Sequence, residues 1–78
     1  MVGTIKARVG ERVARALAEK DWSQAQLARA LGVSENQVNR YLRGRHVPGY
    51  ARLERIAELL EVPAEYLMYG WPDEGDGP

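Results

Sequence analysis

Residues 22 to 34 read Trp22-Ser23-Gln24-Ala25-Gln26-Leu27-Ala28-Arg29-Ala30-Leu31-Gly32-Val33-Ser34. A serine followed three residues later by a glutamine, as in Ser23 and Gln26, is a capping-box pattern that marks the start of a helix. Apolar residues then recur at helical spacing, and Gly32 stands where a helix ends with a positive φ, which glycine adopts at no steric cost. The stretch predicts a short helix over residues 24–31 and a sharp turn after it.

The same pattern repeats directly after the turn. Ser34 and Gln37 form a second capping box, and the apolar residues that follow stand at the i, i+3 and i+4 positions of one helix face. These apolar residues are Val38, Tyr41 and Leu42. The sequence therefore predicts a helix over residues 34–42 with a polar outer face. Two short helices joined by a glycine-containing turn fit any helical hairpin, so this spacing alone does not decide the function.

Longer amphipathic helices flank this hairpin. Apolar side chains at the helical period predict a first helix from about Thr4 to Lys20. A loop at residues 44–49 separates the hairpin from a fourth helix, and Pro63 suits the first turn of a fifth. The apolar residues that mark these three helices are Ile5, Val9, Val13, Ala16, Leu17, Leu53, Ile56, Ala57, Leu60, Tyr66 and Leu67. The predicted fold class is all-α, with five helices.

The C-terminal residues differ in composition from the rest. From Trp71 onward Pro, Gly, Asp and Glu dominate, and such a segment buries too little apolar area to offset the entropy lost on ordering it. We expect residues 73–78 to be disordered. The chain divides into one helical domain over residues 1–71 and an acidic tail over residues 72–78.

Composition argues against several classes of protein. A chain of 78 residues has room for one core, without a separate ligand or dimerisation domain. It has no cysteine and one histidine, so it lacks a disulfide framework, a thiolate zinc site and the ligands of a metal cluster. No stretch resembles a signal peptide or approaches the roughly 18 apolar residues of a membrane span. We expect a soluble cytoplasmic protein with no metal, cofactor, membrane or small-molecule partner.

The charges are segregated along the chain although the formal net charge is zero. Residues 1–55 carry all 11 basic groups and five acids, a formal charge of +6, and residues 56–78 carry six acids and no base. A molecule with one basic end concentrates phosphate there, which favours a nucleic-acid partner. The alternative is a chance segregation of solvated surface charges.

Residues 22–34 resemble the helix-turn-helix of the Cro and phage-repressor family, also called the XRE family. Further residues stand at the spacings that this family uses, and the resemblance covers about residues 9–70. These are Gly44, Pro48, Leu53, Ile56, Ala57, Leu60, Val62 and Leu67. The resemblance implies a compact, lambda-repressor-like domain that binds double-stranded DNA by placing helix 34–42 in the major groove.

The resemblance assigns the base readers to the start of helix 34–42. Arg40 is suited to guanine O6 and N7, and Asn36 to adenine N6 and N7. Glu35 either accepts a hydrogen bond from a cytosine amino group or is simply a favourable charge at a helix N-terminus. Ser34 and Gln37 are additional candidates, although capping already explains both.

Phosphate contacts are expected to flank these readers, because such contacts position a protein on DNA without carrying sequence information. Gln24 begins a helix whose N–H groups suit an anion, and the family uses a glutamine there for a phosphate. The full set of candidates is Gln24, Asn39, Arg43, Arg45, His46 and Tyr50. The alternatives are a solvated basic face for the arginines, which extends to Arg52, and a core-packed loop aromatic for Tyr50.

The chain departs from the family pattern at two positions together. Many members carry an arginine where this chain has Leu17 and a glutamate where it has Leu42, and the two form a largely buried ion pair. Replacing such a pair by apolar residues is often neutral or stabilising, whereas removing one partner leaves a charge unpaired. We therefore predict that Leu17 and Leu42 touch; the alternative is that each fills its own core position.

Small members of the family usually bind DNA as two-fold dimers on half-sites about one helical turn apart. Aromatic and apolar side chains that suit such an interface gather near the end of the fold, at Tyr66, Met68, Tyr69 and Trp71. Alternatively, Tyr66 and Trp71 cover their own core. We expect a homodimer, at least on a two-fold symmetric operator.

The leading functional hypothesis is a sequence-specific transcriptional regulator, most simply a repressor. The alternative is a protein-interaction module or antitoxin-type partner protein with the same fold. An enzyme is not expected, because the chain has no phosphate-binding Gly-Lys-Ser/Thr loop and no metal-ligand spacing. His46, a conventional neutral-pH base, has no obvious nucleophile beside it.

Overall fold

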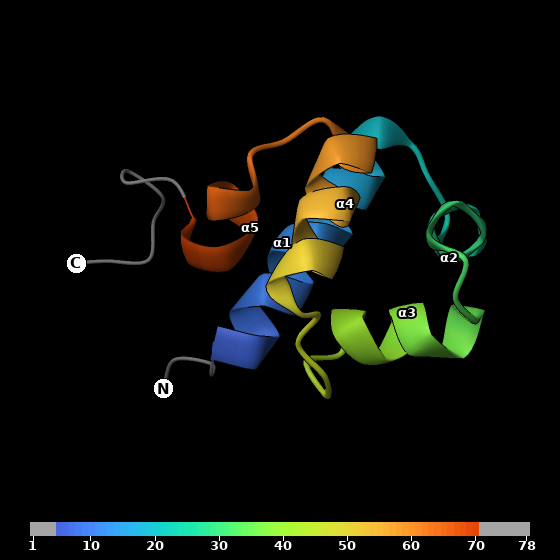
Figure 1. Ribbon diagram of the computed structural model, residues 1–78, viewed down its shortest axis with the longest axis horizontal. Helices are drawn as coiled ribbons and strands as arrows, with labels where there is room; N and C mark the ends of the chain where they lie inside the picture. Colours follow the sequence, from blue (N-terminus) through green and yellow to red (C-terminus); the bar gives the residue numbers. More distant parts are fainter. Residues whose placement is uncertain (1–4, 71–78) are drawn as a thin grey trace.

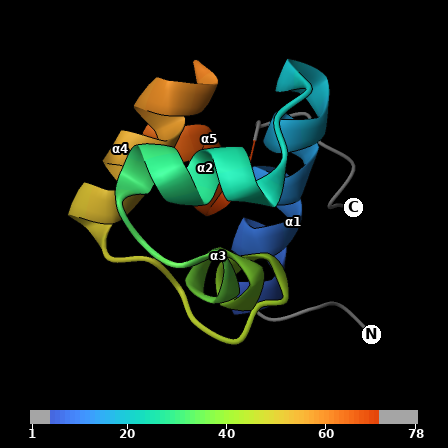
Figure 2. The same cartoon turned by 90° about the vertical axis from the view of Figure 1, so that its right-hand side faces the viewer.

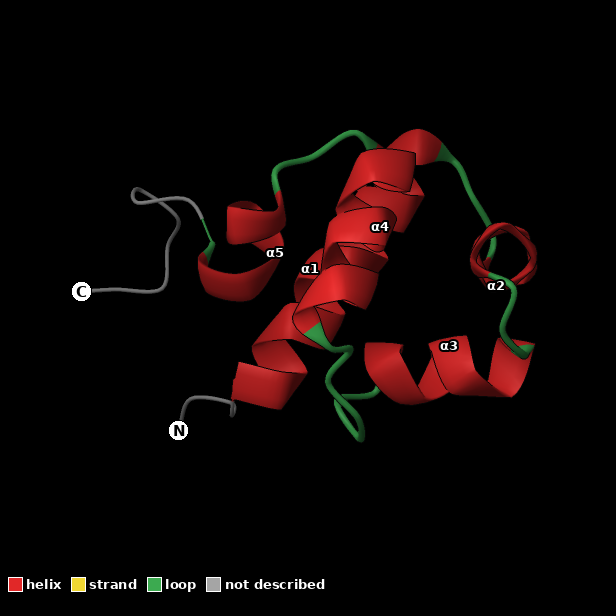
Figure 3. Ribbon diagram, viewed as in Figure 1, coloured by secondary structure: helices red, strands yellow, loops and turns green. Residues whose placement is uncertain are grey.

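The computed structural model describes residues 5–70, which form five α-helices and no strand (Figure 1, Figure 3). The helices are α1 (Ile5–Lys20), α2 (Gln24–Leu31), α3 (Glu35–Leu42), α4 (Tyr50–Leu60) and α5 (Ala64–Tyr69). The all-α, five-helix prediction is confirmed. Trp71 and the predicted acidic tail lie outside the described residues. None of the five helices combines the length and the apolar composition that crossing a bilayer requires.

The helix ends follow the local chemistry of the sequence. At the start of α2 both capping-box bonds form: Ser23 Oγ accepts from the Gln26 N–H at 3.1 Å, and Gln26 Oε1 accepts from the Ser23 N–H at 2.8 Å. Gly32 ends α2 with φ 75° and ψ 31°, the left-handed conformation that was expected. Pro63 lies one residue earlier than predicted, as the N-cap of α5.

The second capping box is only half formed. Ser34 Oγ accepts from the Gln37 N–H at 3.0 Å, as predicted. The side chain of Gln37 does not return to Ser34, because its Nε2 lies 2.8 Å from Nδ1 of His46. The capping-box prediction was therefore wrong for the glutamine side chain, which links α3 to the following loop.

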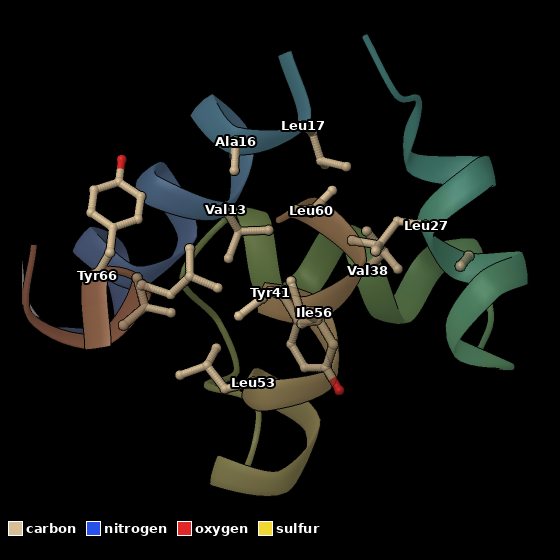
Figure 4. Close-up of a cluster of buried hydrophobic side chains, with 14 residues drawn as sticks. Val13, Ala16, Leu17, Leu27, Val38, Tyr41, Leu53, Ile56, Leu60 and Tyr66 are labelled. Atoms are coloured by element: carbon tan, nitrogen blue, oxygen red, sulfur yellow. The ribbon is translucent and has the colours of Figure 1, made fainter. Parts of the chain in front are cut away.

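The core lies between α1 and α4, with side chains from all five helices (Figure 4). The fully buried side chains are Val9, Val13, Leu27, Val38, Leu53, Ile56 and Leu67. All of them belong to the apolar stripes read from the sequence. Leu31 and Leu42 are only partly buried and pack at the margin of this core. Helix α3 packs mainly against α2 and α1, and these two helices fix its position in the domain.

Gly10 allows α1 to pass close to the end of α3. The residue is buried, and a Cβ atom placed on it would lie 2.5 Å from the carbonyl oxygen of Tyr41 and 2.7 Å from that of Leu42. Real Cβ atoms essentially never lie within 3.0 Å of another heavy atom in this way, so the two helices approach this closely only because residue 10 has no side chain. Nothing in the helical periodicity of α1 indicates this contact.

We expect Gly10→Ala to destabilise the protein although alanine is the better helix former. Overpacking costs about 1–3 kcal/mol, whereas the gain in helix propensity is at most about 1 kcal/mol. Urea unfolding followed by circular dichroism measures the difference. The control is Ala14→Gly, at an exposed position of the same helix, which measures the effect of helix propensity on stability without any change in core packing. A Gly10→Ala protein that gains as much stability as Ala14→Gly loses would show that α1 and α3 are not in close contact.

Leu17 and Leu42 pack on the same core, Leu17 buried and Leu42 partly buried. Their direct contact stays a prediction. Leu42→Glu should lower the free energy of unfolding by roughly 1–3 kcal/mol, because it places a carboxylate against apolar side chains. Adding Leu17→Arg should recover part of that loss if the two side chains touch. Thermal unfolding checks both variants; an unchanged melting temperature for Leu42→Glu, or additive losses in the double variant, would contradict the contact.

Candidate nucleic-acid interface

Helices α2 and α3 cross steeply. Figure 1 shows α3 along its length and α2 end-on, and Figure 2, turned by 90°, shows the reverse. The chain makes this turn over Gly32, whose left-handed backbone lets the N–H of the next residue, Val33, bond to the carbonyl of Ala28 at 3.0 Å. The arrangement is that of a helix-turn-helix, in which the first helix supports the second.

The outer face of α3 is polar and exposed. Successive residues of a helix are rotated by about 100°, so Asn36 and Arg40 point most directly away from the buried Val38 and Tyr41. Both are exposed, as are the predicted base readers Glu35 and Ser34 at the N-terminal end. Gln37 and Asn39 lie on the two flanks of the helix and are half-buried. The structure therefore brings the predicted readers together on one accessible face.

One hydrogen bond ties each flank of α3 to a neighbouring element. On one side Asn39 Nδ2 donates to Gln24 Oε1 of α2 at 3.4 Å. On the other side the Gln37 amide meets the imidazole of His46, in the loop before α4, at 2.8 Å. These four side chains were predicted singly, as phosphate contacts or as a base reader. Their pairing depends on tertiary structure and was not predicted.

The loop after α3 continues the basic surface. Arg43, the C-cap of α3, and Arg45 are exposed. His46 is also exposed, and its ring lies against that of Tyr41, with 5.6 Å between the ring centroids. Arg52 is not the free solvated arginine of the alternative reading, because its Nη1 donates to the Tyr41 hydroxyl at 3.3 Å. The loop thus places two arginines and an imidazole beside the readers.

Tyr50 is the first residue of α4 and is 52% exposed, so it does not pack into the core as the alternative held. The negative charge of Glu54 raises the pKa of the Tyr50 phenol above its usual value, with smaller effects from desolvation and from Glu65. The phenol therefore keeps its proton at neutral pH. A neutral hydroxyl at this edge is able to donate a hydrogen bond to a phosphate oxygen.

The predicted dimer residues differ in exposure. Tyr69 is 72% exposed and Met68 is partly buried, whereas Tyr66 is 5% exposed and packs in the core of its own chain, as the alternative expected. Arg12 of α1, which the sequence reading missed, is 7% exposed and donates from Nη1 to the Met68 carbonyl at 3.2 Å. Its position three residues after Val9, on the buried stripe of α1, is the signal that it lies inside. Trp71 is outside the described residues.

Comparisons with known proteins agree with this geometry. The family model described as Helix-turn-helix matches residues 13–67. Over 66 residues the chain is 36% identical to an uncharacterized HTH-type transcriptional regulator, y4aM, of Sinorhizobium fredii, covering 85% of this chain and 46% of that protein. Over 64 residues it is 40% identical to an uncharacterized transcriptional regulator in the ATPase CF(0) region of Rhodospirillum rubrum, covering 82% and 59%. The chain thus spans about half the length of these relatives.

Solved structures have the same fold. The hypothetical transcription factor NHTF from Neisseria superposes with a TM-score of 0.77 at 28% identity, over 83% of this chain and 75% of that one. SinR, a master regulator for biofilm formation solved in complex with DNA, gives 0.70 at 27% identity, over 76% and 95%. The restriction-modification controller protein C.AhdI from Aeromonas hydrophila gives 0.72 at 23% identity, over 78% and 92%, and shows the likeness of fold alone.

Because the orientation of α3 depends on the turn, Gly32→Ala should destabilise the domain. No atom lies within 4 Å of a Cβ at this position, so the left-handed backbone is the sole source of the loss. That strain amounts to roughly 1–2 kcal/mol. Gly32→Asn should lose less, because asparagine tolerates this conformation. Urea unfolding compares the two variants; equal losses would show that the backbone conformation at residue 32 is not the determinant.

Proposed function

The chain belongs to the helix-turn-helix family, with the predicted resemblance to Cro and phage repressors confirmed, and we propose that it is a sequence-specific transcriptional regulator. The observation that carries the proposal is the exposed polar face at the start of α3. Helix α2 crosses α3 steeply (Figure 2), and exposed arginines lie on α3 and in the loop after it. In such a motif the N-terminal end of the second helix enters the major groove of duplex DNA.

The side chains of α3 divide by direction into two roles. Asn36 and Arg40 point straight away from the core and read base edges, Asn36 at adenine and Arg40 at guanine. Glu35 stands at the N-terminal end, where a carboxylate accepts from a cytosine amino group or favours the helix dipole. The readers are exposed before DNA arrives, so no rearrangement of the core is needed to present them.

Phosphate contacts come from residues beside the readers. Gln24, at the first position of α2, and Asn39 share one hydrogen bond on one flank of α3. Arg43 at the C-cap of α3, Arg45 in the following loop and Tyr50 at the start of α4 are exposed and supply further contacts. Such contacts fix the register of the helix in the groove without selecting a sequence.

We propose a homodimer on a two-fold symmetric operator, acting in the cytoplasm as a repressor that excludes polymerase from a promoter. One eight-residue helix reads only a few base pairs, and a second copy doubles the site. The exposed Tyr69, beside the partly buried Met68, offers aromatic and apolar area for the second copy.

Selection of bound duplexes from a randomised pool at near-physiological salt tests this function and its symmetry together. Enrichment of an inverted repeat with half-sites about one helical turn apart is the expected result. A single short site would contradict the dimer but retain the reader. No enrichment would contradict sequence-specific binding and favour a protein-interaction module.

Single substitutions of Arg40 and Arg43 should affect DNA binding in different ways. Arg40→Ala should weaken binding to the selected site by roughly 1–3 kcal/mol and relax the preference at one base position. Arg43→Ala should weaken binding to every sequence alike and reduce the slope of log K against log salt by about one counterion. Binding titrations on selected and random duplexes at several salt concentrations distinguish the two effects. Equal losses on both duplexes for both variants would refute the division.

A further inference from the structure

We propose that His46 is a positioning residue that orients the amide of Gln37, and that Gln37 thereby reads adenine at one base pair of each half-site. The inference rests on the proposed function and adds a specificity determinant to it. Its basis is the 2.8 Å contact between Gln37 Nε2 and His46 Nδ1, which takes Gln37 out of the capping box that its sequence position predicts.

Gln37 lies where a reader can reach the groove. It is at the third position of α3, on the flank nearest Arg40, and is only half-buried. Its backbone N–H already caps the helix through Ser34 Oγ at 3.0 Å. The side chain is therefore not needed to start the helix and is free for another role.

The bond to His46 leaves the recognition edge of the amide intact. An amide NH₂ group has two N–H bonds, and a histidine Nδ1 that accepts one of them carries its own proton on Nε2. The second N–H and Oε1 of Gln37 remain, and within residues 5–70 no hydrogen bond is made to that oxygen. This pair of groups matches adenine, with N7 as acceptor and N6 as donor. With the opposite amide orientation, Oε1 would face the imidazole and be lost to the base.

The imidazole of His46 is itself held in place by a contact with Tyr41. Its ring lies against Tyr41, at 5.6 Å between centroids and 41° between planes. Tyr41 is 5% exposed and its hydroxyl accepts from Arg52 of α4. Gln37 is thus connected through two rings to the core and the next helix. A side chain ordered in this way before binding loses less conformational freedom when it meets a base.

Two substitutions at residue 46 distinguish the contribution of the aromatic ring from that of the Nδ1 hydrogen-bond acceptor. His46→Phe retains a ring against Tyr41 but removes the Nδ1 acceptor. His46→Asn removes the ring but retains an acceptor oxygen near the position of Nδ1. Because residue 46 is exposed on a loop, both variants are expected to fold, and thermal unfolding verifies this. The Gln37→Ala variant identifies the base pair that Gln37 reads: it is the position of the site at which the variant loses the base preference of the wild-type protein.

The measurement is the ratio of dissociation constants for duplexes with adenine and with another base at that position. We expect the wild-type protein to prefer adenine on the order of tenfold. His46→Asn should retain the preference, and His46→Phe should lose most of it, as Gln37→Ala does. In the Gln37→Ala background, His46→Phe should reduce it no further. Arg45→Ala, next to His46, should weaken binding to all duplexes and leave the ratio unchanged.

Three results would overturn the inference. The first is that Gln37→Ala changes the base preference at no position of the site, or only at a position that does not prefer adenine. The second is that His46→Phe retains the preference for adenine, and the third is that His46→Asn loses this preference as completely as His46→Phe. These results require a wild-type protein that selects a DNA sequence. If the wild-type protein selects none, the proposed function fails, and the inference falls with it.

Discussion

The structure depends on one constraint: the helix that carries the candidate readers is too short to exist by itself. Isolated helices below about 12–15 residues are marginal in water, and α3 has eight residues, of which the exposed ones are polar. Its order comes from Val38 and Tyr41 in the core, from the close passage of α1 at Gly10 and from one hydrogen bond on each flank. The remaining four helices form the support that holds this one in position.

The distribution of charge follows the same organisation. Helix α3 and the loop after it, which carry exposed arginines, lie at one end of the domain, at the bottom of Figure 1, and the turn between α4 and α5 lies at the top. Glu58 and Glu61 stand near that second end, and each is paired with a cation, Glu58 with Arg55 and Glu61 with Lys20. The exposed arginines at the first end attract phosphate, so the field of the domain favours an approach to DNA with that end first.

Sequence predicted the parts of this structure that local chemistry decides. Caps and a glycine set the ends of α2, and apolar periodicity identified the core, because both depend on residues only a few positions apart. The close approach at Gly10, the bond from Arg12 to the Met68 carbonyl and the link from Gln37 to His46 depend on how distant segments meet, so spacing along the chain does not predict these contacts. Each nevertheless left a trace: a glycine inside a helix, an arginine on an apolar stripe, and a histidine in a basic loop.

The central claim is that the start of α3 and its two flanks form the surface that meets DNA. The most direct test is to follow backbone amide resonances of the ¹⁵N-labelled protein as an inverted-repeat duplex from the selection is added. The account predicts the largest shifts at the N-terminus of α2, along residues 34–40 and in the loop at residues 43–46, with α1 little changed. Shifts concentrated on the exposed residues of α4 and α5, with α3 unaffected, would contradict it.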